Sequence, residues 1–216
     1  MGIFSFFKRK ENAQDKGWRT GGMEDFMTLI RVYYQAALAA KLHISNLALL
    51  PDLRIFKQTL KVPTQGNRLG LSEKNRCRAM LMDIYQMPEP FFKECDTSID
   101  KHCRNMQQMQ QYMFSFQAFT QELMMVVGSL MKWKFRVPGF MKKALYAMTE
   151  KTVQDICTKD VWKDASVQRG VMNVRRYSQQ LGYSQQWMTD FVYHVIILAK
   201  KEPKPQDAEE KSKRQH

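Results

Sequence analysis

The sequence predicts an all-α fold, and three observations support this prediction. Glycine and proline are few, at 10 and 7 of 216 residues, which favours long uninterrupted helices over an architecture of strands and turns. Apolar residues recur at spacings of three and four along most of the chain, and we find no credible strand run. Hydrophobic residues make up 44%, which is enough for a globular core. We therefore expect a bundle of about six or seven helices around one long central helix over about 96–135.

The chain divides into three parts by composition. Residues 1–22 form a basic and apolar N-terminal segment, and residues 23–201 carry the helical periodicity of a single domain. Residues 202–216 are charged and contain proline, so we expect a disordered tail.

The first half of the domain contains three expected helices. Glu24 and Asp25 occupy the first turn of a helix over about 23–43. A second helical stretch at about 45–61 contains Pro51, which is either a kink or the first residue of a new helix. After a loop, Ser72 is expected to cap a helix that covers about 73–86, and MPEPFF at 87–92 closes the section.

The longest expected helix covers about 96–135. One apolar seam alternates spacings of three and four along it: Ile99, His102, Met106, Met109, Met113, Phe116, Thr120, Leu123, Val127 and Leu130. The flanks are rich in glutamine and lack opposite charges, so packing within the protein's own bundle is favoured over a dimeric coiled coil. The stretch KWKFRVPGFMKK at 132–143 is interpreted as the basic end of this helix, because Pro138 forbids its continuation.

The C-terminal part predicts helices over about 139–157, 165–181 and 185–200. Gly182 ends the second of these, and Ser184 caps the third. The stretch VRRYSQQLGYSQQWMTDF, which surrounds Gly182, resembles the helix-turn-helix motif of DNA-binding proteins. This weak resemblance implies contacts to phosphates and bases by Arg175, Arg176, Gln185 and Gln186. The second helix carries no Lys or Arg before its end, so a helical hairpin within the bundle is the favoured alternative.

The formal net charge of +13 is concentrated in three stretches. Residues 54–78 carry +6, residues 123–149 carry +5 without a single acid, and residues 1–22 carry +3. Such concentrated charge attracts phosphates of nucleic acid or of anionic lipid. The predicted polyanion-binding residues are Arg54, Lys57, Lys61, Arg68, Lys74, Arg76, Arg78, Lys132, Trp133, Lys134, Arg136, Lys142 and Lys143.

The first ten residues predict a weak interfacial anchor. Ile3, Phe4 and Phe7 share one face of a short amphipathic helix, and three bases follow directly. The patterns of a secretory signal and of N-myristoylation are both absent, the latter because position 6 is Phe6. No stretch reaches the length of a transmembrane helix.

Signals for an enzyme or a metal site are weak. The sequence contains no P-loop, no GxGxxG, no HExxH and no nucleophile elbow. The densest cluster of chemical groups, ECDTSIDKHC at 94–103, lacks the paired Cys/His spacing of a structural zinc site. We therefore predict no catalytic residue, no metal and no cofactor. The four cysteines show no CxxC pair and no disulfide-framework spacing, which favours a reducing, cytoplasmic location.

These observations together predict a non-enzymatic basic helical protein. It would dock on a polyanion, with nucleic acid slightly preferred over an anionic membrane surface, and no small-molecule substrate is evident. A peripheral position at the membrane stays open. The alternative is a helical scaffold subunit that oligomerises, or binds a protein partner, through the heptad seam and a methionine-rich surface.

Overall fold

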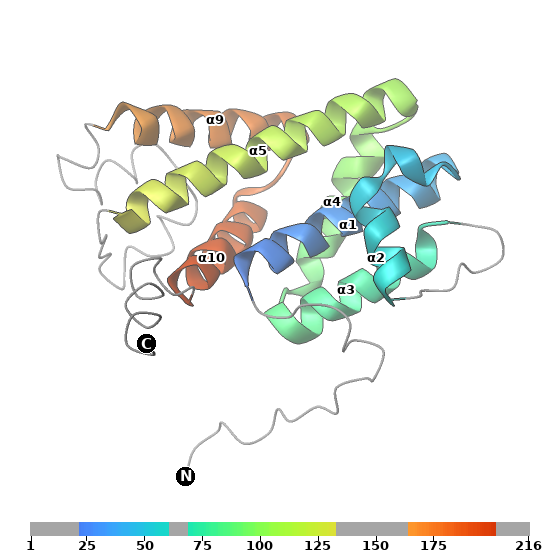
Figure 1. Ribbon diagram of the computed structural model, residues 1–216. Helices are drawn as coiled ribbons and strands as arrows, with labels where there is room; N and C mark the ends of the chain where they lie inside the picture. Colours follow the sequence, from blue (N-terminus) through green and yellow to red (C-terminus); the bar gives the residue numbers. More distant parts are fainter. Residues whose placement is uncertain (1–21, 61–68, 133–163, 202–216) are drawn as a thin grey trace, which may run out of the picture.

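The computed structural model describes residues 22–60, 69–132 and 164–201, with side chains to 129 and 199 in the last two ranges. Within these ranges the chain folds into seven α-helices and one short 3-10 turn, without strands (Figure 1). The elements are α1 (Met23–Leu42), η3 (Leu47–Leu49), α2 (Pro51–Leu60), α3 (Leu71–Tyr85), α4 (Glu89–His102), α5 (Met106–Lys132), α9 (Ala165–Leu181) and α10 (Gln185–Lys201). The predicted all-α bundle is confirmed. The helix predicted over 139–157 lies outside the described residues.

The helix at the centre of the bundle is α1, not the predicted helix over 96–135. It packs against α2, α3, α4 and α10 (Figure 1). Its buried residues run from Phe26 to Ala39 with only two interruptions, so they cover most of the helix circumference. A helix that is apolar nearly all round is stable only when other elements surround it.

The helix predicted over 96–135 is two helices, and this part of the prediction was wrong. Helix α4 ends at His102, where Cys103 leaves helical geometry with φ −121°. The amide of Gln108 donates to Asn105 Oδ1 at 2.9 Å, which caps the start of α5. In return, Gln108 Oε1 accepts from the amide of Arg104 at 2.8 Å. This reciprocal pair is close to the capping box, in which a polar cap is followed three residues later by Glu or Gln.

The seam on α5 is buried inside the chain's own bundle, mainly against α9 and α10. Met109, Phe116, Leu123 and Val127 are all less than 4% exposed. Tyr112, Phe119 and Val126 are buried beside them, so the apolar stripe is wider than the seam. Met106 is 38% exposed, because it lies in the first turn next to the break between the helices.

Several predicted helix ends are correct. Pro51 is the first residue of α2, where its missing N–H is harmless. Gly182 ends α9 with φ 75°. The amide of Trp187 donates to Ser184 Oγ at 3.1 Å, so Ser184 caps α10 as expected.

Two other predicted ends need correction. The cap of α3 is Gly70 rather than Ser72, and the side chain of Glu73 accepts from the Gly70 amide at 2.9 Å. Gly70 has φ 106°, which an L side chain rarely adopts. The stretch MPEPFF follows the end of α3 at Tyr85, but it also starts the next helix, because α4 begins at Glu89 with Pro90 in its first turn.

Candidate functional site

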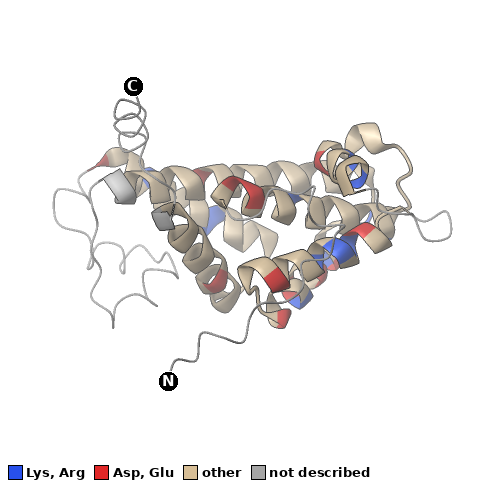
Figure 2. Ribbon diagram, turned by 60° about the horizontal axis from the view of Figure 1, so that its bottom comes forward, with Lys and Arg blue, Asp and Glu red and all other residues tan. Residues whose placement is uncertain are grey.

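The first basic stretch, residues 54–78, lies on α2 and α3, and the acids of the bundle neutralise much of it. Lys57 pairs with Glu73 at 3.2 Å, Lys74 pairs with Asp96 at 2.7 Å, and Arg78 pairs with Glu89. Arg54 is exposed and Arg76 is partly buried. Lys61 and Arg68 lie outside the described residues. Figure 2 accordingly shows blue and red positions interspersed along the described helices.

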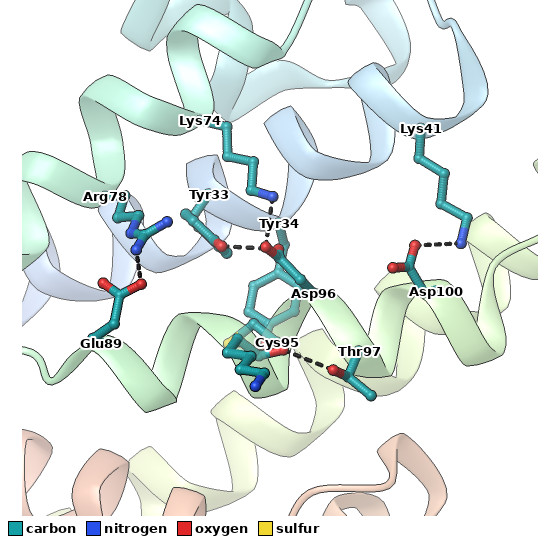
Figure 3. A network of polar contacts seen from close by, with 11 residues as sticks. Tyr33, Tyr34, Lys41, Lys74, Arg78, Glu89, Cys95, Asp96, Thr97 and Asp100 are labelled. Carbon is teal, nitrogen blue, oxygen red and sulfur yellow. Dashed lines mark hydrogen bonds and ion pairs between the residues drawn. The ribbon is translucent and has the colours of Figure 1, made fainter.

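Asp96 is the centre of this ionic network between α1, α3 and α4 (Figure 3). The hydroxyl of Tyr33 donates to its Oδ1 at 2.8 Å, and Lys74 Nζ donates to its Oδ2 at 2.7 Å. Lys74 also lies 5.6 Å from the centre of the Tyr33 ring. Burial, and then the negative charge of Asp96, raise the pKa of Tyr33 far above its ordinary value. Lys74 is therefore held by two partners within the bundle.

The cluster at 94–103 is distributed over different sides of α4. Asp100 pairs with Lys41 of α1 at 2.7 Å (Figure 3), while Cys95 and Cys103 are buried. Among the described residues no three His, Cys, Asp or Glu side chains are arranged to hold a metal ion. His102 lies at the end of α4, and its Nε2 is buried without a hydrogen-bond partner.

Cys95 is a structural thiol. Its Sγ accepts from the hydroxyl of Tyr34 at 3.0 Å and from Trp187 Nε1 at 3.2 Å. Burial raises the pKa of Cys95 to about 12, so the thiol stays protonated near neutral pH. A nucleophilic or redox role requires thiolate, so this environment opposes such chemistry.

A chain of buried hydroxyls extends from Cys95 across the bundle. Tyr34 and Tyr183 are 2.5 Å apart at their oxygens, and Tyr183 and Tyr112 are 2.9 Å apart. Ser98 continues the chain, 2.8 Å from the Tyr112 hydroxyl, and donates to the carbonyl oxygen of Leu181. The network joins α1, α4, α5 and the turn before α10, so it fixes how these elements pack. The sequence does not reveal it, because its members are far apart along the chain.

Most residues predicted for the second basic stretch, and all those predicted for the N-terminal anchor, fall outside the described ranges. Lys132 is the last residue of α5, and its side chain is not described. The other predicted residues of both sites lie outside the described residues: Trp133, Lys134, Arg136, Lys142, Lys143, Ile3, Phe4 and Phe7.

The segment that resembles a helix-turn-helix motif forms α9, a three-residue turn and α10. Arg175, Arg176, Gln185 and Gln186 are all exposed. One face of α10 is nevertheless buried in the bundle, including Trp187, Phe191 and Val195. Its outer face presents Gln186, whose Nε2 donates to Asp190 Oδ1 at 3.0 Å, and Tyr193. This arrangement favours the helical hairpin, while DNA contact by the four exposed residues stays a prediction.

A groove of about 840 Å³ lies between α1, α5 and α9, and the sequence did not indicate it. Methionines line much of it: Met23 and Met27 from α1, and Met124 and Met125 from α5. Glu24 and Glu122 also line it. Groove volumes of this size are typical of ligand or peptide sites, and methionine side chains adapt to irregular partners.

The fold and the groove define the class of this protein as an all-α bundle with a methionine-lined groove. Within the described residues, each helix is too short or too polar to cross a membrane. The chain belongs to the family described as "Domain of unknown function (DUF8491)", whose model matches residues 1–207. Searches of curated proteins and of solved structures found no match.

Proposed function

We propose that this chain is a non-enzymatic protein that docks on a polyanion, with nucleic acid slightly preferred over an anionic membrane surface. The distribution of charge carries the proposal. The described ranges contain 16 Lys and Arg and 12 Asp and Glu, a net charge of +4. The other +9 of the total +13 belongs to residues 1–21, 61–68 and 133–163, since residues 202–216 are neutral overall. Most of the excess positive charge therefore lies outside the helices whose bases pair with acids.

Helix α9 supports the same proposal from within the bundle. Arg169, Arg175 and Arg176 are exposed, and no acid occurs between Ala165 and Leu181. Arginine is well suited to phosphate because its planar guanidinium donates two parallel hydrogen bonds.

Binding measured at two salt concentrations tests the proposal. Fluorescein-labelled single-stranded DNA, duplex DNA and an RNA hairpin are titrated by anisotropy, and vesicles containing phosphatidylserine by co-sedimentation. If about four phosphates are contacted, the affinity should fall about 100-fold between 50 and 200 mM salt. Binding to vesicles alone would identify a membrane surface instead, and an absence of salt-sensitive binding to every probe would reject the proposal.

A matched pair of double variants tests the contribution of α9. Arg175→Gln with Arg176→Gln should weaken binding about tenfold and lower the salt slope by about 2. Lys93→Gln with Lys101→Gln removes the same charge from exposed positions of α4. Equal effects of the two double variants would mean that only net charge matters, and would remove α9 from the interface.

A second candidate function is a helical scaffold that binds a protein partner. The methionine-lined groove supports it, together with Phe114 of α5, which is 71% exposed. Light scattering at tens of micromolar tests self-association, and a strict monomer would restrict this function to partners other than the chain itself.

A further inference from the structure

The groove between α1, α5 and α9 combines an apolar lining with acidic groups. The four methionines among its described lining residues provide a flexible apolar surface. Arg31 is the one basic side chain in that described lining, and it already has partners. Its Nε lies 3.3 Å from Asp52 Oδ1, and an Nη donates to Thr28 Oγ1 at 2.9 Å. An occupant that is both apolar and cationic would therefore complement the groove.

Glu122 strengthens the preference for a cation. Its Oε1 accepts from Asn173 Nδ2 of α9 at 3.0 Å, while its Oε2 is buried and has no hydrogen-bond partner. The negative charge of Glu122 lies at the groove wall, where it would attract a cationic occupant. Glu24 adds a second, exposed carboxylate on the α1 side.

We propose that this groove binds residues 3–10 of the same chain. That segment, IFSFFKRK, supplies both required properties: Ile3, Phe4 and Phe7 are apolar, and Lys8–Lys10 are cationic. The apolar side chains pack against the methionines, and the bases face Glu24 and Glu122.

Chain connectivity favours this segment over other occupants. Met23, the first residue of α1, lines the groove, so residues 11–21 join the segment directly to the groove wall. Eleven extended residues span up to roughly 40 Å, so the tether is long enough for the segment to reach the groove. A tether of this length gives an effective concentration in the millimolar range, so even weak intrinsic affinity fills the groove.

The C-terminal segment fits less well. Residues 202–216 contain no Phe, Tyr, Trp, Leu, Ile or Met, and cannot fill an apolar groove. Residues 133–163 carry both apolar and basic side chains and join α5 about 10 Å along the helix axis from Met125, so the test below includes a probe in this segment.

The inference goes beyond the proposed function and does not depend on it. The groove would cover the same apolar side chains that the sequence predicts as an interfacial anchor. The segment would then be available to a lipid surface only after it leaves the groove.

Photo-crosslinking in the full chain tests the proposal. We would place 4-benzoylphenylalanine at position 4, irradiate the monomeric protein without any polyanion, and map the products by mass spectrometry. We expect intramolecular cross-links to α1 near Met27 and to α5 near Met124. Cross-links confined to other regions, or products joining two chains, would overturn the proposal. The proposal would also be overturned if a probe at position 133 gave cross-links to the groove while the probe at position 4 gave none.

A matched pair of variants makes the test specific to the groove. Met125→Lys adds a repelling charge to the groove, and Met125 is 55% exposed, so the fold should tolerate the change. Met172→Lys makes the same change on α9 at a position that is 58% exposed and does not line the groove. Met125→Lys should lower the yield of groove cross-links about five- to tenfold, because it removes apolar contact and adds repulsion. Met172→Lys should leave the yield of groove cross-links unchanged. Equal yields in the two variants would refute the binding of residues 3–10 in the groove. Loss of polyanion binding in either variant would bear on the proposed function alone.

Discussion

The two sides of α1 differ in how completely their polar groups are matched. Toward α3 and α4, Tyr33 and Lys74 share Asp96, while Tyr34 bonds Cys95. Toward α2, Gln35 donates to Asp52 at 2.7 Å and accepts from the amide of Leu53 at 2.9 Å. Toward α5 and α9, the first two turns of α1 instead border the groove.

This difference separates a side that specifies the fold from a side that can accept an occupant. Directional hydrogen bonds tolerate one arrangement of helices, because a displaced donor or acceptor is left unpaired in the interior. Methionine contacts tolerate many arrangements. The predictions below test this contrast in order of decreasing loss of stability, and each control follows the variant that it matches.

Gly70→Ala should have the largest effect, because Gly70 lies where α3 begins directly against α1. An added Cβ would lie 2.6 Å from the backbone nitrogen of Ala40 and would overlap the carbonyl oxygen of Ala36, and φ is already 106°. Backbone atoms cannot give way as a side chain can, so we expect a loss of about 4 kcal/mol in the free energy of unfolding. Urea denaturation monitored by circular dichroism measures this loss. A loss below about 1 kcal/mol would contradict the close contact between the start of α3 and α1.

Tyr183→Phe tests the buried hydroxyl network. It removes the hydroxyl between Tyr34 and Tyr112, each of which keeps one other partner, Cys95 or Ser98. We expect a loss of about 1–2 kcal/mol by the same denaturation assay.

The matched control is Tyr177→Phe at the groove. Tyr177 is partly buried, and its ring lies 4.9 Å from the Arg176 guanidinium carbon. We expect a change within about 0.5 kcal/mol. Equal losses in the two variants would remove the distinction between the matched side and the groove.

The fold was predictable where its signals are local. Gly182 and Ser184 mark the turn between α9 and α10 by their own conformational preferences, and both assignments are correct. The break after α4 was missed because apolar spacings of three and four continue from Ile99 through His102 to Met106. Asn105 and Gln108 carry the sequence signal of a helix start, but they do not interrupt the apolar periodicity.

The sites were less predictable because they depend on tertiary contacts. Counting charge along 54–78 could not show that Lys74 and Arg78 face acids of α4, which lie elsewhere in the chain. The groove combines Met23 and Met27 with Met124 and Met125, and no spacing rule relates two pairs so distant in sequence.

Gly170→Ala tests how well the interface between α5 and α9 can adjust. An added Cβ would lie 2.5 Å from Val126 Cγ2, which is a side-chain atom, unlike the backbone atoms at Gly70. Overpacking outweighs the gain in helix propensity, so we expect a net loss of about 1 kcal/mol. In a Val126→Ala background the clash is gone, and the same substitution should stabilise by about 0.5–1 kcal/mol. A loss in both backgrounds would mean that the backbone there is as rigid as at Gly70.

His102 should give the smallest effect, a pH dependence at the end of α4. Its ring lies beside Gly182, and burial, followed by the charge of Lys101, lowers the pKa of His102 below its usual 6.5. The unfolded chain therefore binds this proton more readily than the folded chain, and the free energy of unfolding decreases as the pH falls through 6.5.

A His102→Gln variant lacks this titration, so its stability should decline less than that of the unmodified chain as the pH is lowered. Denaturation curves at several pH values compare the two, and an NMR titration of the imidazole measures the pKa directly. Parallel stability curves, or a pKa above 6.5, would mean that the folded protein accepts the charged ring as readily as water does.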